Sequence, residues 1–317
     1  MEARGGIDLG GTKIQAVVVD GDYGVVGEAR HPTPRDGGPA GVAEAMAGAL
    51  REAAAAAGVE PGSLAGVGVG SPGNVDDAAG TVSRARNLPD WEASFELGPA
   101  LAEALGTRVR LGNDVQVATD AEHRLGAGRG YTSLLGVFWG TGVGGGIILD
   151  GEAWLGRSGA GEIGHMVVKR DGARCPCGRR GCMEAYAGRA AMEAHARKEH
   201  EHGTKTDLFS IMRKHERERL TSGIWSRAVE KGDHLAKHLI ERAVEALGCG
   251  VASACNLLDV EAVIIGGGMG LRFGEPGVER IAAAMQPHLF NDANPPDVRL
   301  AALGDLGGAT GAALLVD

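Results

Sequence analysis

Glycine clusters that follow short apolar runs constrain the fold of this chain more than any other feature of its sequence. One cluster lies in GIDLGGTKIQAVVVDGDYGVV (residues 6–26) and another in SLLGVFWGTGVGGGIILDGEAWL (residues 133–155). In each stretch, two runs of apolar and β-branched residues flank a glycine-rich turn, which is typical of a β-hairpin. The two stretches form a weak internal repeat, visible in pattern more than in identity. The sequence therefore predicts two similar halves.

Strand-like and helical segments alternate along the rest of the chain. Apolar residues recur at helical spacing over 42–58, 115–126 and 234–258, and shorter polar helices are expected within 190–232. Short buried strands are expected in LAGVGVGSPG, RVRLGND and VEAVIIGGGMG. Strands that alternate with helices predict an α/β protein.

The overall charge and the apolar pattern exclude several classes of protein. The formal net charge is −9, whereas a nucleic-acid-binding face requires a basic surface. There is no run of 18 apolar residues, so no membrane span is expected. The first strand pattern already includes Ile7, which leaves no room for a signal peptide. We therefore expect a cytoplasmic protein without nucleic-acid or membrane partners.

The first glycine cluster, DLGGTK, has the chemistry of a phosphate-binding loop. Glycines allow backbone N–H groups to approach a phosphate, and a threonine adds a hydroxyl donor. A lysine adds positive charge, and the aspartate could hold Mg²⁺ through water. The alternative is a plain hairpin turn, since neither the P-loop nor the Rossmann fingerprint is present. The residues concerned are Asp8, Gly10, Gly11, Thr12 and Lys13.

Two further glycine clusters strengthen the phosphate interpretation. WGTGVGGG repeats the chemistry of the first loop in the second half, although it also suits a tight hairpin turn. IIGGGMG is interpreted as a third loop after a strand, with room for a flat ligand such as adenine. The residues expected to contact the nucleotide are Gly140, Thr141, Gly142, Gly266, Gly267 and Gly268.

Asn113 and Asp114 lie where a predicted strand meets a predicted helix. Both residue types favour the N-cap position, which is the structural alternative. A carboxylate at a helix N-terminus also stays ionised, because the helix dipole stabilises it. An ionised Asp114 can take the proton from a hydroxyl group that attacks phosphorus.

Three clustered cysteines and a nearby histidine form a candidate metal site. Five cysteines, an odd number, in a reducing compartment make disulfides unexpected and favour zinc. Four ligands complete a tetrahedral site and leave no position for water, so the zinc is expected to be structural. The four ligands are His165, Cys175, Cys177 and Cys182.

Three polar residues near these motifs are candidates for binding a substrate. Glu162 and Glu184 flank the cysteine segment, within two or three residues of an expected ligand, although either one could be a plain surface glutamate. Asn87, in RNLPDW, is a polar loop residue whose structural alternative is a turn former.

Taken together, these motifs resemble the ROK family (repressors, open reading frames, sugar kinases), and within it the bacterial glucokinases. DLGGTK resembles the first phosphate loop of the family, and GVFWGTGVGGGIILDGEAWLGRSGAGEIGH resembles its long signature. CPCGRRGCMEAYAG resembles its cysteine motif, which is the most specific part. The resemblance covers nearly the whole chain.

The resemblance implies an actin-like, hexokinase-type fold with two ribonuclease-H-like lobes and a cleft between them. The N-terminal lobe would comprise residues 1–115, joined by the C-terminal helix at about 304–317. The C-terminal lobe would comprise residues 116–303, with an inserted zinc-binding segment at 165–182. A homodimer or homotetramer is also implied.

The resemblance further implies ATP and Mg²⁺ as the phosphate donor and assigns roles to the polar residues. Asp114 would be the catalytic base. His165 would have two roles, with one ring nitrogen on zinc and the other toward the sugar. The residues implied to bind sugar hydroxyls are Asn87, Asn113, Asp114, Glu162, His165 and Glu184.

The expected activity is ATP-dependent phosphorylation of a hexose, with D-glucose converted to glucose 6-phosphate. Repressors of the family carry a DNA-binding module before the kinase-like part, and a first motif at Asp8 leaves no room for one. The alternatives are a kinase for mannose, fructose, allose, N-acetylglucosamine or N-acetylmannosamine, and a sugar sensor without turnover. Polyphosphate as the donor also stays open.

Overall fold

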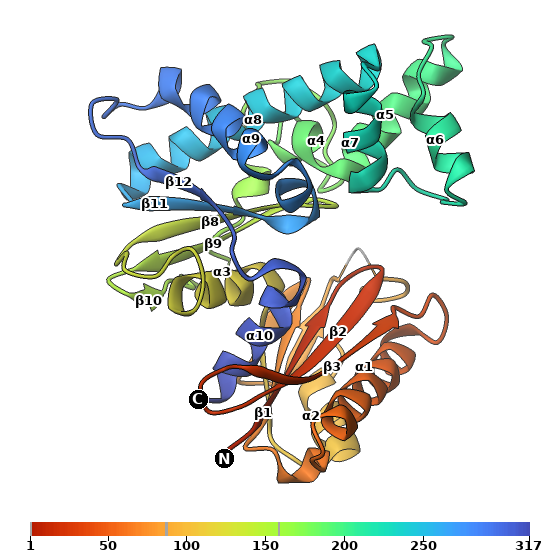
Figure 1. The fold of residues 1–317 in the computed structure, drawn as a ribbon, viewed down its shortest axis with the longest axis vertical. Helices are drawn as coiled ribbons and strands as arrows, with labels where there is room; N and C mark the ends of the chain where they lie inside the picture. The colour runs from red at the N-terminus through yellow and green to blue at the C-terminus, as the bar shows by residue number, and fades with distance from the viewer. Residues whose placement is uncertain (1, 86–87, 158) are drawn as a thin grey trace. The chain divides into compact units, whose positions relative to one another are not determined.

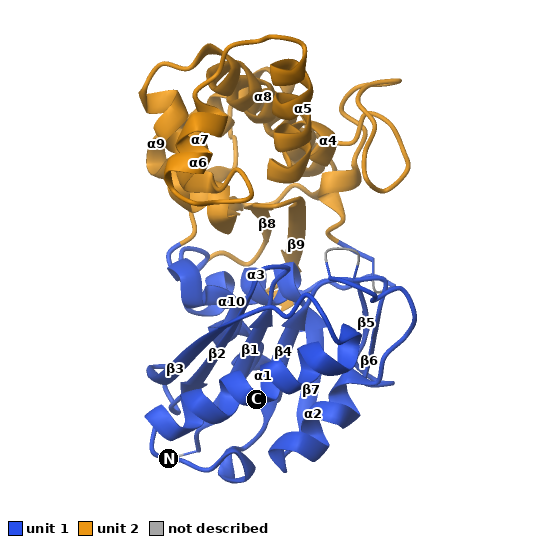
Figure 2. Ribbon diagram, turned by 90° about the vertical axis from the view of Figure 1, so that its right-hand side faces the viewer, with its two compact units in different colours: residues 1–130, 153–160, 302–317 blue, residues 131–152, 161–301 orange. Residues whose placement is uncertain are grey.

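The computed structural model describes residues 2–85, 88–157 and 159–317, which form two compact units (Figure 2). Unit 1 comprises Met1–Gly130, Ala153–Ala160 and Ala302–Asp317. Unit 2 comprises Tyr131–Glu152 and Gly161–Ala301. Unit 1 thus extends beyond the boundary expected between residues 115 and 116, which falls inside the helix Asp114–Arg124.

Unit 1 contains a five-stranded mixed sheet. The first two strands form the expected antiparallel hairpin, and the third continues it, while the next two run parallel to the first. A separate two-stranded hairpin pairs β5 (Asn74–Asp76) with β6 (Thr81–Ser83). In spatial order, the sheet consists of β3 (Val25–Pro32), β2 (Lys13–Val19), β1 (Arg4–Leu9), β4 (Val67–Ser71) and β7 (Val109–Asn113).

Helices cover both faces of this sheet (Figures 1 and 2). The large core lies between the sheet and α1 (Gly38–Ala56) with α2 (Leu97–Leu105). On the other face, α10 (Gly307–Ala313) packs on β1 and β4 and against α3 (Asp114–Arg124). This approach requires glycine in the strands, because a Cβ at Gly6 would lie 1.9 Å from the Ala309 carbonyl oxygen. Packing against α10 explains why α3 belongs to unit 1.

Unit 2 repeats the strand order of unit 1. Its first two strands again form an antiparallel hairpin, and two parallel strands follow on the other side of the first. This repetition confirms the α/β class and the internal repeat predicted from the two glycine-rich stretches. In spatial order, the sheet consists of β10 (Glu152–Ala153), β9 (Val143–Leu149), β8 (Leu134–Trp139), β11 (Ala262–Gly266) and β12 (Asp297–Leu300).

Unit 2 is richer in helices than unit 1. The longest helix, α8, spans the predicted segment 234–258 and packs against α9. Within the described residues, no helix has both the length and the apolar character needed to cross a membrane. The helices are α4 (Glu184–Ala187), α5 (Arg189–Glu201), α6 (Leu208–Lys214), α7 (Ser222–Glu230), α8 (His234–Leu258) and α9 (Gly267–Met285).

Candidate functional site

Polar side chains from separate parts of the sequence meet at one edge of the sheet of unit 1. Asp8 lies opposite Gly70 in the register of β1 with β4, and Ser71 lies opposite Asn113 in the register of β4 with β7. These three strands are parallel, so their carboxyl ends lie side by side. Asp114 follows immediately as the first residue of α3. The carboxyl edge of a parallel sheet is the usual place for a ligand in α/β proteins.

The start of α3 is built by Asn113 and Asp114 together. The side-chain oxygen Oδ1 of Asn113 accepts hydrogen bonds from the backbone N–H groups of Val115 and Gln116, both at 3.1 Å. Oδ1 of Asp114 also accepts from Val115, at 2.9 Å. The N-cap alternative is therefore correct for Asn113, and capping occupies its carboxamide oxygen. Asp114 is half-buried at this helix N-terminus, where the dipole stabilises its charge.

Asp8 precedes the first glycine turn and is held among charged neighbours. Burial raises its pKa to about 6, with Lys13 lowering it and Asp305 raising it. The turn itself is tight, since the Gly10 N–H donates to the Lys13 carbonyl at 2.9 Å. Lys13 Nζ lies 3.2 Å from Asp305 Oδ1 and also donates to Gln15. The positive charge expected at this loop is thus balanced by a carboxylate.

The second glycine turn joins β8 to β9 and contacts the start of α5. The Gly140 N–H donates to the Gly142 carbonyl at 2.9 Å, which closes the turn. The N–H groups of Arg189 and Ala190 donate to the carbonyls of Gly140 and Thr141 at 3.1 and 3.0 Å. The Arg189 guanidinium also donates to the Thr141 hydroxyl at 2.8 Å. Sequence reasoning missed Arg189, because one arginine at the start of a helix carries no motif.

The third glycine cluster corrects a prediction. Gly266–Gly268 do not form a loop, because β11 ends at Gly266 and α9 begins at Gly267. Gly267 has φ +79°, and a Cβ there would lie 2.5 Å from the Trp139 carbonyl oxygen. A Cβ added at Gly140 would lie 4.0 Å from the Gly268 backbone nitrogen. The second and third clusters are therefore neighbours at one edge of the sheet of unit 2.

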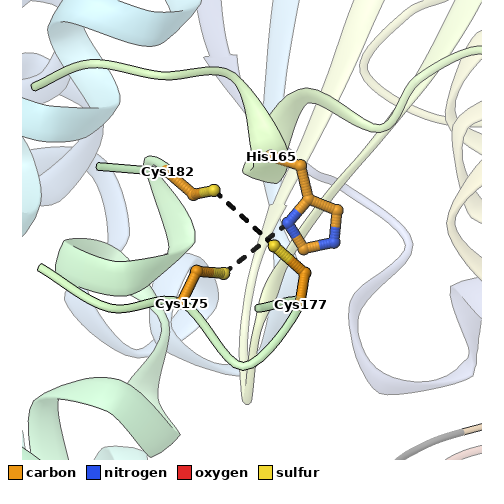
Figure 3. Close-up of side chains that lie close together, drawn as sticks. All are labelled: His165, Cys175, Cys177 and Cys182. Atoms are coloured by element: carbon orange, nitrogen blue, oxygen red, sulfur yellow. Dashed lines mark hydrogen bonds between the residues drawn. The ribbon is translucent and has the colours of Figure 1, made fainter. Parts of the chain in front are cut away.

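His165 and the three cysteines converge in unit 2 (Figure 3), with all four ligand atoms within 4.8 Å of one another. Cys177 and Cys182 have their sulfurs 3.7 Å apart, and Cys175 Sγ lies 3.8 Å from His165 Nδ1. Zinc–sulfur bonds of about 2.3 Å place two sulfur ligands of a tetrahedral ion about 3.8 Å apart. The ligand types and spacings therefore fit zinc.

Two glutamates approach this cluster from different sides. Glu162 is exposed, and its Oε2 lies 3.8 Å from His165 Nε2, the ring nitrogen that faces away from the cysteines (Figure 3). Glu184 Oε1 lies 3.9 Å from Cys175 Sγ, while its Oε2 accepts the Val143 N–H at 3.0 Å. Glu184 thus links the cysteine cluster to the second glycine turn. Asn87, expected to contact the sugar, lies outside the described residues.

Comparisons with known proteins agree with the resemblance. The ROK family model matches residues 4–317, and the chain belongs to the ROK family. It is 34% identical over 272 residues to a glucokinase of Thermotoga maritima, covering 85% of this chain and 83% of the relative. It is 32% identical to an N-acetylgalactosamine kinase of a Shewanella species, covering 98% and 95%.

A solved structure supports the fold assignment directly. The chain superposes with a TM-score of 0.83 on a ROK family glucokinase from Streptomyces griseus in complex with glucose and AMPPNP. The two are 31% identical, and the match covers 99% of this chain and 98% of that one. The predicted actin-like, hexokinase-type fold is therefore confirmed.

Proposed function

We propose that this protein transfers the γ-phosphoryl group of ATP to a hydroxyl of a hexose and that D-glucose is its preferred sugar, giving glucose 6-phosphate. The observation that carries the proposal is the match over nearly the full chain to a glucokinase that holds glucose and AMPPNP. The relative from Thermotoga maritima, also named glucokinase, supports the same sugar. Phosphoryl transfer requires positioning and charge neutralisation more than covalent chemistry, which suits two glycine turns and a few carboxylates.

The nucleotide would be bound by backbone groups at the glycine clusters. Backbone N–H groups of Gly11, Thr12, Thr141 and Gly142 would donate to phosphate oxygens. Gly10 and Gly140 would let a phosphate approach the backbone closely, and Lys13 would add charge. Asp8 would hold Mg²⁺ through water, which is consistent with its place among charged groups at the end of β1. Gly266–Gly268 would offer flat backbone to the adenine ring.

Asp114 would be the general base. Its place at the N-terminus of α3 keeps the carboxylate ionised, and its hydrogen bond to Val115 fixes the side-chain orientation. As the sugar hydroxyl attacks phosphorus, Asp114 Oδ would accept the hydroxyl proton, and ADP would leave with the electrons of the broken P–O bond. The other proposed sugar ligands are Asn87, Asn113, Glu162, His165 and Glu184.

We propose that zinc occupies the cluster of His165, Cys175, Cys177 and Cys182 in a structural role. Bound zinc would stabilise the loop that carries these ligands. His165 Nδ1 faces the sulfurs and Nε2 faces Glu162, so one ring can hold the ion and still present its other nitrogen to the sugar. Fixing a histidine ring through one nitrogen to orient the other is common around metal sites.

A kinase for an N-acetylated hexose is the second candidate. The N-acetylgalactosamine kinase that matches 98% of this chain favours it, at an identity similar to that of the glucokinases. The cysteine cluster and the glycine turns would have the same roles in either enzyme. A sensor that binds sugar without turnover would need the same pocket but no base, and Asp114 argues against it.

We also propose that the chain forms a homodimer or homotetramer. Phe290 and Leu257 are 92% and 83% exposed, and the Phe290 N–H donates to Asn256 on α8 at 2.8 Å. Two large apolar side chains on neighbouring segments favour contact with another copy. Light scattering should give a mass at least twice that of one chain.

The test is a panel of sugars with purified protein and Mg²⁺-ATP, read as ADP release. The panel contains D-glucose, mannose, fructose, allose and three N-acetylhexosamines, and polyphosphate replaces ATP in a parallel series. The highest kcat/KM on D-glucose would support the first candidate, whereas the highest value on an N-acetylhexosamine would replace it with the second. Sugar binding by calorimetry without turnover would support the sensor.

A further inference from the structure

Arg189 connects the second glycine turn to a polar network around the buried Glu193 in unit 2. One nitrogen of its guanidinium donates to the Thr141 hydroxyl at 2.8 Å, and another donates to the Leu220 carbonyl at 2.9 Å. Its backbone N–H donates to the Gly140 carbonyl. Arg189 is therefore fixed at three points, two of which lie on the turn that would hold phosphate.

Glu193, one helical turn further along α5, fixes the other side of the network. Its side chain is only 2% exposed and accepts the N–H of Leu220 at 3.0 Å. Arg197 and Arg219 both donate to the same carboxylate, at distances from 2.7 to 3.1 Å. Burial alone would raise the pKa of Glu193, but these hydrogen bonds outweigh it and lower the pKa. The carboxylate is thus ionised and satisfied.

Both backbone polar groups of Leu220 are hydrogen-bonded in this network. Its carbonyl accepts from Arg189, and its N–H donates to Glu193. The Arg189 guanidinium is therefore held in place by Leu220, which Glu193 holds in turn. Glu193 at the centre of the network is buried, and a buried carboxylate with all its hydrogen bonds formed makes the groups around it rigid. Because Arg189 donates to Thr141, the network also restricts the orientation of the Thr141 hydroxyl.

The hydrogen bond from Arg189 also determines what Thr141 can do. A hydroxyl has one donor and two acceptor positions. Because the guanidinium can only donate, the Thr141 oxygen must accept from it, and the hydroxyl proton points elsewhere. At a turn that faces phosphate, that proton is an oriented donor, and the charge of Arg189 strengthens it.

We propose that Arg189 is a positioning residue for the nucleotide: it orients the Thr141 hydroxyl toward a phosphate oxygen and holds a positive charge behind the second glycine turn. The inference rests on the proposed function, which places the phosphates of ATP at this turn. On this proposal, the start of α5 helps to recognise the phosphates of the nucleotide and does not recognise its nucleoside.

The test compares the affinities of Arg189→Gln, Arg189→Lys and Thr141→Val for Mg²⁺-AMPPNP and for adenosine by calorimetry. Arg189→Gln should weaken AMPPNP binding about 10- to 100-fold, the loss typical of a hydrogen bond to a charged group. Adenosine affinity should be unchanged. Arg189→Lys, which keeps the charge but cannot bridge Thr141 and Leu220, should lie between wild type and Arg189→Gln. Lys198→Gln removes one positive charge from an exposed position on the same helix and should change neither affinity.

A double-mutant cycle of Arg189→Gln and Thr141→Val tests whether Arg189 affects AMPPNP binding through Thr141. If Arg189 acts through Thr141, the double variant should bind AMPPNP no more weakly than the worse single variant. Unchanged AMPPNP affinity in Arg189→Gln, equal losses for adenosine and AMPPNP, or additive losses in the cycle would overturn the inference and leave the kinase proposal intact. If Arg189→Gln does not fold, the same comparison is made with Arg189→Lys and Thr141→Val. Each variant should then lose affinity for AMPPNP and keep its affinity for adenosine. A wild type that binds neither ligand would overturn both proposals.

Discussion

The two glycine turns have the same place in two similar sheets but different surroundings. The turn between β1 and β2 follows a carboxylate, Asp8, and its lysine is paired with Asp305. The turn between β8 and β9 has no charged residue of its own, and α5 and Glu184 hold it by hydrogen bonds. The two units therefore share the backbone of the hairpin turn but differ in the side chains that surround it.

This difference suggests that unit 1 contributes mainly to catalysis and unit 2 mainly to substrate binding. The carboxyl edge of the sheet in unit 1 carries Asp8 and Asp114, the groups suited to a cation and a proton. Unit 2 connects its turn to the cysteine cluster through Glu184, which suits recognition. Changes in unit 1 should therefore affect mainly kcat, whereas changes in unit 2 should affect mainly KM.

The largest effect is expected in unit 1, at Asp114. Asp114→Asn should lower kcat by at least about 100-fold, because general base catalysis contributes roughly 10²–10⁴-fold. The amide oxygen can still accept the Val115 N–H, so the start of α3 should stay intact. Initial rates give kcat, and the melting temperature and sugar affinity serve as controls. A kcat near that of wild type would remove Asp114 from this role.

The next largest effect is expected at the cysteine cluster. Cys177→Ser should lose zinc and raise the KM for sugar about 10- to 100-fold, because ring orientation at His165 depends on the ion. Zinc content by atomic absorption and KM are measured on the same preparation. Cys249→Ser, a thiol on α8 outside the cluster, is the matched control. A zinc-free variant with an unchanged KM would contradict the link.

Within the second turn, two glycines provide a matched pair. A Cβ at Gly142 would lie 2.3 Å from Glu184 Oε2, which must then move away from the Val143 N–H. Losing that hydrogen bond should cost about 1–3 kcal/mol of stability and raise the KM for both substrates. Gly140→Ala should leave the melting temperature nearly unchanged, since the nearest neighbour of its Cβ would be 4.0 Å away. Equal melting temperatures for the two variants would show that Glu184 does not depend on the turn.

The smallest effect is a pH dependence that belongs to unit 1. The pKa of Asp8 is raised from 3.8 to about 6, so the folded protein holds this proton more tightly than the unfolded chain. Its contribution to stability is fully present below about pH 4 and is lost as the pH rises toward about 6. The melting temperature of wild type relative to Asp8→Asn, measured without Mg²⁺, should therefore fall from pH 4.5 to pH 7. A difference that rises with pH would contradict the burial of Asp8.

Local patterns in the sequence predicted the elements that local rules govern. The two hairpins, α3 and α8 follow from period and turn chemistry, and the four metal candidates follow from ligand type and spacing. Gly266–Gly268 were predicted as a loop because a glycine cluster follows a strand pattern there. The chain instead passes directly from β11 into α9, and Gly267 has a positive φ and no space for a Cβ beside the Trp139 carbonyl oxygen.

Features that depend on packing between distant segments were not predictable. Glu193 lies in a segment that looks like a solvated polar helix, yet it is buried because Arg197, Arg219 and Leu220 surround it. Arg189 gains its importance only from contact with a turn 48 residues earlier. The link from Glu184 to Val143 is equally invisible in one sequence. Charge patterns suggest such contacts only when an i, i+4 pair such as Glu193 and Arg197 is present.

Phosphoryl transfer to D-glucose can be followed by ³¹P NMR with purified protein and Mg²⁺-ATP. Glucose 6-phosphate and ADP should accumulate in equal amounts, and Asp114→Asn should slow the formation of both at least about 100-fold while still binding the sugar. ADP that forms without a sugar phosphate would rule out phosphoryl transfer to glucose, and equal turnover in Asp114→Asn would rule out Asp114 as the base.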